Sequence, residues 1–323
     1  MRRLFMTGLG LSVILYLLPA VWSLTGTAEP PELLTVPQTV AGEIKNEGGG
    51  QPTITVQLEG TPVEMPLEQY VEGVTAAEIP NDFPIEAIRA QAVAARTYAV
   101  YKCRLGRSEV HPDADVCDNF SHCAAYRDPA AAAAAGTGLD RVRQAVQNTA
   151  GQILTCQGAP IAAVFHSASG PRTEAARDVW GEDVPYLQSV VSPGGSASSE
   201  YEDTVTVSAD EFRKKVNEAF PSADVSGAPR TWFKASERSE AGGIITVKLG
   251  GVPVEGTAVR TLFGLHSTNF TITTTEDSIS FHTVGYGHGV GLSQYGARYM
   301  AEQGASYIDI LTHYYKDTVL SNV

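Results

Sequence analysis

Two consecutive helices are predicted in residues 66–98, PLEQYVEGVTAAEIPNDFPIEAIRAQAVAARTY. Pro66 suits the first position of a helix, and the apolar residues after it recur at helical spacing. Pro80 ends this helix near Glu78, because a proline disfavours helical backbone in the residue before it. A second helix then begins at Pro84, with isoleucines and alanines along one face. We expect the rest of the chain to pack around these two helices.

Glu78 is the candidate acid of this stretch. It lies among alanine, isoleucine and proline residues at the C-terminal end of a helix. Apolar surroundings and the negative end of the helix dipole both raise the pKa of a carboxyl group, as a general acid near neutral pH requires. The alternative is a solvated surface glutamate.

Arg96 is the second catalytic candidate, since it lies among apolar residues and its guanidinium needs an acceptor. It either binds a substrate carboxylate, orients Glu78, or forms a structural ion pair.

A possible metal site follows the second helix. His111, Cys117 and Cys123 are separated by five residues each, and an imidazole with two thiolates is a good ligand set for zinc. A Cys117–Cys123 disulfide is the alternative outside the cytoplasm. His122 is either a fourth ligand or a loop histidine. The other two cysteines, Cys103 and Cys156, either pair with each other or stay free.

The composition is that of a globular protein with 323 residues, of which 43% are hydrophobic and 18% are charged. The formal net charge of −13 argues against nucleic acid as a partner, because no basic surface is available for phosphates. We expect an α+β fold of helices and β-hairpins, arranged in two lobes. One lobe gathers residues 53–195 with the C-terminal helices, and a second lobe covers about residues 196–284.

The N-terminus predicts a membrane anchor. Arg2 and Arg3 precede an uncharged run that ends at Leu24, which is long enough to span a bilayer. Residues 1–24 are therefore expected to form a single-pass transmembrane helix, with the remainder of the chain outside the cytoplasm. The alternative is a signal peptide cleaved after Ala28. Residues 25–50 are rich in Thr, Pro, Glu and Gly and predict a flexible linker to a domain at residues 51–323.

Two further segments contain polar and small residues, FHSASGPRTE at 165–174 and GYGHGVGLSQYGA at 285–297. The second segment lacks the glycine that a nucleophile elbow requires after Ser293, and it lacks the Lys-Ser/Thr of a phosphate-binding loop. Its alternating glycines permit close approach of the backbone to a ligand or a packed neighbour.

The motifs PLEQY, AAEIP and FPIEAIRAQAVAARTY resemble those of the stage II sporulation protein D family, with Ile79 where Met is usual. The resemblance continues through residues 151–196 and 244–315. It implies a membrane-anchored lytic transglycosylase that cuts peptidoglycan glycan strands without water, with Glu78 as its acid. Some family members bind zinc through a histidine and two cysteines at the spacing of His111, Cys117 and Cys123.

The resemblance also implies that the two lobes face a glycan-binding cleft with a substrate groove, and it implies partners. The candidate groove residues are Ser167, Ser169, Gly170, Tyr186, His288, Ser293, Gln294 and Tyr295. The expected partners are peptide-free glycan strands, the amidase called stage II sporulation protein P and other engulfment membrane proteins. The expected location is the mother-cell membrane, facing the intermembrane space. The rival functions are a wall-binding module of the amidase-enhancer type and a zinc hydrolase.

Overall fold

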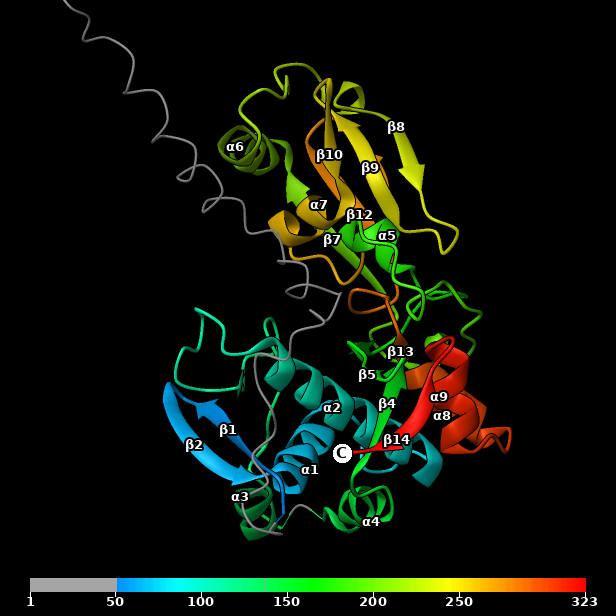
Figure 1. Cartoon of the computed structure of the whole chain (residues 1–323). Helices are drawn as coiled ribbons and strands as arrows, with labels where there is room; N and C mark the ends of the chain where they lie inside the picture. The colour runs from blue at the N-terminus through cyan, green and yellow to red at the C-terminus, as the bar shows by residue number, and fades with distance from the viewer. Residues whose placement is uncertain (1–50, 137) are drawn as a thin grey trace, which may run out of the picture.

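The computed structural model describes residues 51–136 and 138–323 as an α+β protein with helices and several small sheets, as expected (Figure 1). Its buried hydrophobic side chains form two clusters. The first core draws on residues 54–190 and 290–315, and the second core on residues 207–281. The chain therefore leaves the first core, builds the second and returns. The second core falls within the predicted second lobe, whereas the glycan-binding cleft stays a prediction.

The first core is built on the two predicted helices. Helix α1 spans Leu67–Glu78 and stops before Pro80, and Ile79 between them has extended backbone. Helix α2 spans Ile85–Leu105 and is almost completely buried, because α1, α4, α8 and α9 all pack against it. The other helices of this part are α3 (Pro129–Ala134), α4 (Asp140–Asn148), α5 (Ala176–Trp180), α8 (Gln294–Glu302) and α9 (Tyr307–Tyr314).

Three small sheets accompany these helices, with strand orders β2-β1-β3, β14-β4-β5 and β13-β6. Their strands are β1 (Thr53–Leu58), β2 (Thr61–Pro66), β3 (Val116–Cys117), β4 (Gln152–Cys156), β5 (Ala159–Pro160), β6 (Phe165–His166), β13 (Leu292–Ser293) and β14 (Val319–Asn322). The parallel β13–β6 pair places Ser293 beside His166, so the two polar segments singled out in the sequence lie side by side.

The second core lies between helices and two antiparallel sheets, with orders β10-β9-β8 and β11-β12-β7. Stacked aromatic rings fill it, with Phe212 on Trp232 at 5.2 Å and on Phe263 at 4.9 Å. Its elements are β7 (Glu202–Ser208), α6 (Ala209–Ala219), β8 (Phe233–Arg238), β9 (Ile244–Leu249), β10 (Val252–Glu255), α7 (Gly256–Phe263), β11 (Phe270–Thr274) and β12 (Ser278–Val284). Short 3₁₀ turns at Gly195–Ala197 and Pro229–Thr231 complete the fold.

The glycine-rich loop after β12 packs against the 165–174 segment. Gly287 has φ +113°, and an added Cβ would lie 2.7 Å from the Cβ of His166. Gly289 has φ +80°, and its added Cβ would lie 2.8 Å from Cγ of Glu174. Only glycine meets both demands at these positions. The alternating glycines therefore serve close backbone packing, one of the two predicted uses.

Several elements begin or turn at local signals. Ser208 caps α6, and Ser306 with Asp309 forms a capping box at α9. The hairpin β1–β2 turns at Glu59 and Gly60. The alanine-rich segment Pro129–Ala134 forms a short helix of its own, α3, which is separate from α4.

Of the residues that the structure describes, none belongs to a helix with the length and apolar character of a membrane span. The predicted anchor at residues 1–24 and the predicted linker at residues 25–50 lie outside the described residues.

Candidate functional site

Glu78 is the last residue of α1, and its half-buried carboxyl group is held by two donors. The backbone N–H of Ala125 donates to Oε1 at 2.9 Å, and the side chain of Gln294 forms a second hydrogen bond. Burial raises the pKa of Glu78, while these two bonds oppose the rise. The upward shift in the pKa of Glu78 agrees with the prediction for a general acid.

Two buried side-chain amides, those of Gln294 and Gln91, support Glu78. Gln294 begins α8, where Ser293 caps the helix, and its Nε2 donates to Oε1 of Gln91 at 3.4 Å. Gln91 comes from α2 and is completely buried, and its own Nε2 has no hydrogen-bond partner among the described residues. Buried amides are costly unless they are bonded, so this pair fixes the direction in which Gln294 presents its donor.

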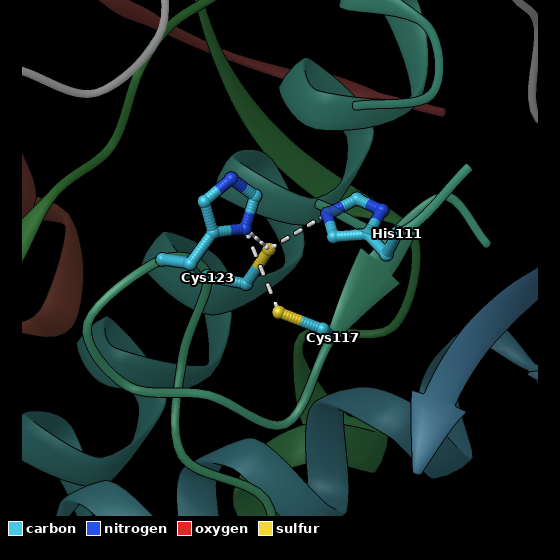
Figure 2. Close-up of side chains that lie close together, drawn as sticks. His111, Cys117 and Cys123 are labelled. Carbon is cyan, nitrogen blue, oxygen red and sulfur yellow. Dashed lines mark hydrogen bonds between the residues drawn. The ribbon is translucent and has the colours of Figure 1, made fainter. Parts of the chain in front are cut away.

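Four potential metal ligands meet in the loop between α2 and α3. The ligand atoms of His111, Cys117, His122 and Cys123 all lie within 4.8 Å of one another (Figure 2). The Cys123 sulfur is 3.5 Å from Nε2 of His111 and 3.3 Å from Nδ1 of His122, and the Cys117 sulfur is 3.5 Å from the same Nδ1. The structure thus places His122, whose role the sequence left open, beside the three predicted ligands.

The chemistry of this donor set fits zinc. A sulfur and a nitrogen on one tetrahedral zinc ion are about 3.5 Å apart, close to the spacings found here. Nδ1 of His111 contacts the carbonyl oxygen of Ala114 at 2.8 Å, which leaves Nε2 available as the ligand. The hydrogen bond from Cys123 lowers the pKa of Cys117 to about 5, so this thiol is ionised at neutral pH, as a ligand must be. All four cysteines of the chain are free thiols, which disfavours the two disulfide alternatives.

The loop that carries these ligands also holds Glu78. Ala125, the donor to Glu78, follows Cys123 by two positions. The residue after Ala125 is Tyr126, whose ring stacks on Tyr70 of α1 with the ring centroids 6.0 Å apart. The Tyr126 ring also lies against Gly73, so that a side chain at position 73 would clash with it. The four candidate ligands therefore lie on the same loop that positions the candidate acid.

Arg96 forms the structural ion pair that was one of its three predicted roles. Its guanidinium is fully buried and contacts both carboxylate oxygens of Glu68, with Nε at 2.8 Å from Oε1 and Nη2 at 2.5 Å from Oε2. It also donates to the carbonyl oxygens of Gln152 and Val146. These contacts turn Arg96 toward the α1–α4 side of the first core, and they do not favour its predicted catalytic role.

Several groove candidates come together near Gln294. Ser169 donates its backbone N–H to the Ser293 hydroxyl at 3.4 Å, and Tyr295 donates its backbone N–H to the carbonyl oxygen of Ser167 at 3.0 Å. The ring of Tyr295 meets Phe83 edge to face at 5.2 Å. The pairing of β6 with β13 accounts for this arrangement.

The remaining groove candidates occupy structural positions. Tyr186 belongs to the first core, and its hydroxyl accepts a hydrogen bond from the N–H of Ala162 at 3.2 Å. His288 has both ring nitrogens in backbone contacts, at 2.9 Å from the Phe165 carbonyl oxygen and 3.1 Å from the Val290 nitrogen. Burial lowers the pKa of His288 to about 3, so its ring stays neutral. Gly170 is buried against Asn269.

Gln91, Ala125 and Glu174 were not predicted as site residues. Gln91 is a polar residue on an otherwise apolar helix face, which is a usable signal in the sequence. Ala125 acts through its backbone N–H, so its side chain gives no signal in the sequence. Glu174 is a buried carboxyl residue at the boundary of the two cores.

Comparisons with known proteins agree with these motifs. The family described as Stage II sporulation protein matches residues 60–156. Stage II sporulation protein D of Bacillus amyloliquefaciens is 33% identical over 97% of this chain and 94% of its own length. The protein of the same name from Bacillus subtilis is 36% identical over 80% of this chain and 75% of its own. The amidase enhancer of Bacillus subtilis is 27% identical over 78% of this chain but only 40% of its own length.

Proposed function

This chain belongs to the stage II sporulation protein D family, and from that membership we propose that it is a lytic transglycosylase of peptidoglycan. The family supports a cell-wall role in sporulation. The proposed reaction cuts the β-1,4 bond between N-acetylmuramic acid and N-acetylglucosamine in peptide-free glycan strands. The observation that carries the proposal is Glu78, a carboxyl group with a raised pKa that is held by one amide and one backbone N–H.

One carboxyl group is enough for this reaction. Hydrolytic glycosidases need two, one to protonate the leaving oxygen and one to activate water or attack the sugar. Among the contacts of residues 51–136 and 138–323, none joins Glu78 to a second carboxyl group. Protonated Glu78 would give its proton to the glycosidic oxygen. Its carboxylate would then take the proton of the C6 hydroxyl of N-acetylmuramic acid, whose oxygen closes on C1 to form the 1,6-anhydro ring.

We also propose that His111, Cys117, His122 and Cys123 hold a structural zinc ion. Four protein ligands complete a tetrahedral site and leave no position for a reacting water, which favours a structural role over a zinc hydrolase. Zinc would cross-link the loop that ends at Ala125. The loop in turn presents its N–H to Glu78.

The proposed setting follows from the family. Residues 1–24 would anchor the chain in the cell membrane, with the domain outside the cytoplasm on the mother-cell side. The stem-peptide amidase, stage II sporulation protein P, would supply peptide-free strands during engulfment, together with other engulfment membrane proteins.

Product analysis tests the proposed reaction. The full chain is incubated with peptide-free glycan strands, and the ends are identified by mass spectrometry. We expect 1,6-anhydro ends from the wild type and from the exposed control Glu182→Gln, and none from Glu78→Gln, which cannot transfer a proton. If a folded Glu78→Gln variant still makes 1,6-anhydro ends, Glu78 is not the general acid of the reaction.

The alternative function is a wall-binding module, which the similarity to the amidase enhancer favours. Strand binding by the wild type without any cleavage product would support it. Reducing ends that disappear on chelation would instead indicate a zinc hydrolase.

A further inference from the structure

A serine lies directly behind one of the candidate metal ligands. The hydroxyl oxygen of Ser108 is 3.5 Å from Nε2 of His122, while Nδ1 of the same ring faces the two cysteine sulfurs. Ser108 is only 7% exposed, and its hydroxyl oxygen also accepts the backbone N–H of Val110 at 3.2 Å. The loop therefore holds a polar group against the nitrogen of His122 that points away from the cysteines.

The two ring nitrogens of His122 have different surroundings. Nδ1 lies 3.3 Å from the sulfur of Cys123 and 3.5 Å from the sulfur of Cys117. An imidazole that binds a metal ion through Nδ1 carries its hydrogen on Nε2, and a buried N–H needs an acceptor. The hydroxyl oxygen of Ser108 provides that acceptor.

The same contacts permit a second arrangement of the hydrogens. A serine hydroxyl can also donate, so Nε2 could accept, and Nδ1 of His122 would then donate its hydrogen to a sulfur. One N–H points toward one sulfur, whereas Nδ1 lies at nearly equal distances from both. The sulfur of Cys123 is also 3.5 Å from Nε2 of His111, and the four ligand atoms all lie within 4.8 Å of one another. This arrangement favours four ligands of one ion over a single N–H···S hydrogen bond.

His111 is supported in an equivalent way, but through the opposite nitrogen. Its Nδ1 contacts the carbonyl oxygen of Ala114 at 2.8 Å, and its Nε2 faces Cys123. A carbonyl oxygen only accepts, so it fixes the hydrogen on Nδ1 and leaves Nε2 for the metal. The support of His111 comes from the backbone, whereas that of His122 comes from a hydroxyl group that one substitution removes.

We propose that Ser108 is a positioning residue of the metal site, which holds His122 as the fourth ligand by accepting its Nε2–H. The proposal rests on the zinc site proposed above and adds the residue that keeps this site closed. Four protein ligands complete a tetrahedral zinc site, whereas three leave one position open to water. Without the hydroxyl of Ser108, the ring of His122 is free to turn away, and the fourth position opens to a small ligand.

Cobalt(II) serves as the probe of this closed site, because its absorption spectrum reports the number and type of its ligands. The full-length protein is loaded with cobalt, and azide is added as a small competing ligand. We expect the wild type to keep its spectrum in azide, since no position is open. Ser108→Ala should give a spectrum that shifts with azide, as should His122→Phe, which removes the fourth ligand outright.

Zinc affinity is measured by competition with a chromophoric chelator. Loss of a group that supports a metal-bound histidine weakens metal binding by about 10-fold to 100-fold, so we expect a loss of this size in Ser108→Ala. Ser108→Thr keeps the hydroxyl and should retain most of the wild-type affinity. Ser121→Ala is the matched control, because Ser121 is an exposed serine of the same loop that contacts Asn119 through its backbone N–H.

The position of the hydrogen on His122 is measured without changing Ser108. Long-range ¹H–¹⁵N spectra of the zinc-loaded wild type show which ring nitrogen carries the hydrogen, and His122→Phe assigns the signal. We expect the hydrogen on Nε2 of His122 and on Nδ1 of His111. This measurement decides the question even where Ser108→Ala fails to fold.

Each outcome decides the role of Ser108. A hydrogen on Nδ1 of His122 overturns the proposal, as does a folded Ser108→Ala variant with wild-type zinc affinity. Weaker zinc binding in a variant whose cobalt spectrum stays insensitive to azide also overturns it, because the site is then still closed. A wild type that binds no zinc overturns the zinc site together with this role. None of these measurements uses a glycan, so the proposed transglycosylase reaction is tested separately by its products.

Discussion

Replacement of Gln294 by methionine tests how Glu78 is held. Methionine keeps the length of the side chain but removes the amide that bonds to Glu78 and to Gln91. The bond to Glu78 lowers the pKa of that carboxyl group, so its loss raises the pKa further above the ordinary value. The first step of the proposed reaction needs protonated Glu78, so we expect activity to fall as the pH rises through this pKa. We expect the alkaline limb of the pH–activity profile to move to higher pH in Gln294→Met.

The same change should also slow the reaction. In the proposed reaction, negative charge develops on Glu78 as its proton leaves, and the hydrogen bond from Gln294 would stabilise that charge. A hydrogen bond to a charged group is worth about 1.5–3 kcal/mol, so we expect kcat to fall by about 10-fold to 100-fold. The assay is the initial rate of 1,6-anhydro end formation from peptide-free strands, measured across acid to mildly alkaline pH. Gln303→Met, an exposed change at the end of the same helix, is the control.

A structural effect has a different signature. Gln294→Met leaves the buried amide of Gln91 without its partner, and this alone lowers stability. The double variant Gln91→Met with Gln294→Met removes both amides and should regain part of the melting temperature, but not the wild-type pH profile. An alkaline limb that stays in place, or moves to lower pH, would refute the idea that Gln294 donates to Glu78.

Three other perturbations follow from the contacts of the first core. Cys117→Ser should abolish zinc binding, measured by elemental analysis, and lower the melting temperature, measured by thermal denaturation. A chelator should lower the melting temperature of the wild type and of the control Cys156→Ser, but not that of Cys117→Ser. Glu68→Gln should destabilise the fold by about 3–5 kcal/mol, because it leaves the fully buried charge of Arg96 unpaired, and urea denaturation measures the loss. Gly73→Ala should cost about 1–3 kcal/mol and reduce activity, because the new methyl group displaces the tyrosine ring that holds the loop beside Glu78; an unchanged melting temperature would contradict this packing.

Local signals predicted the elements around Glu78 well. Pro80 and Pro84 act on the backbone next to them, so the end of α1 and the start of α2 could be placed from the sequence. Caps are equally local, because Ser208 and Ser306 each accept the backbone N–H three residues further on. The apolar neighbours of Glu78 correctly indicated burial and a raised pKa.

Contacts between distant segments were harder to predict. The strands β6 and β13 have two residues each, which is too short for any periodic pattern. Arg96 was expected to bind a substrate carboxylate, to orient Glu78 or to form a structural ion pair, and the sequence could not name its partner. The structure shows the ion pair, because α1 packs on α2 so that Glu68 reaches the guanidinium. No local signal marks Glu68 as this partner, and only the packing of the two helices brings the two side chains together.

Glu78 and its amide partner Gln294 come from opposite ends of the described chain, and this order matters during synthesis. A growing chain has its candidate acid and its candidate metal ligands long before α8 exists. Until that helix is made, the acid has only the Ala125 N–H for support, and the β13–β6 pair beside it cannot form. Strand β14, at the very end, then pairs with β4 of the first core. An unfinished or truncated chain therefore lacks an assembled site, so a protein proposed to cut the cell wall would become active only when it is complete.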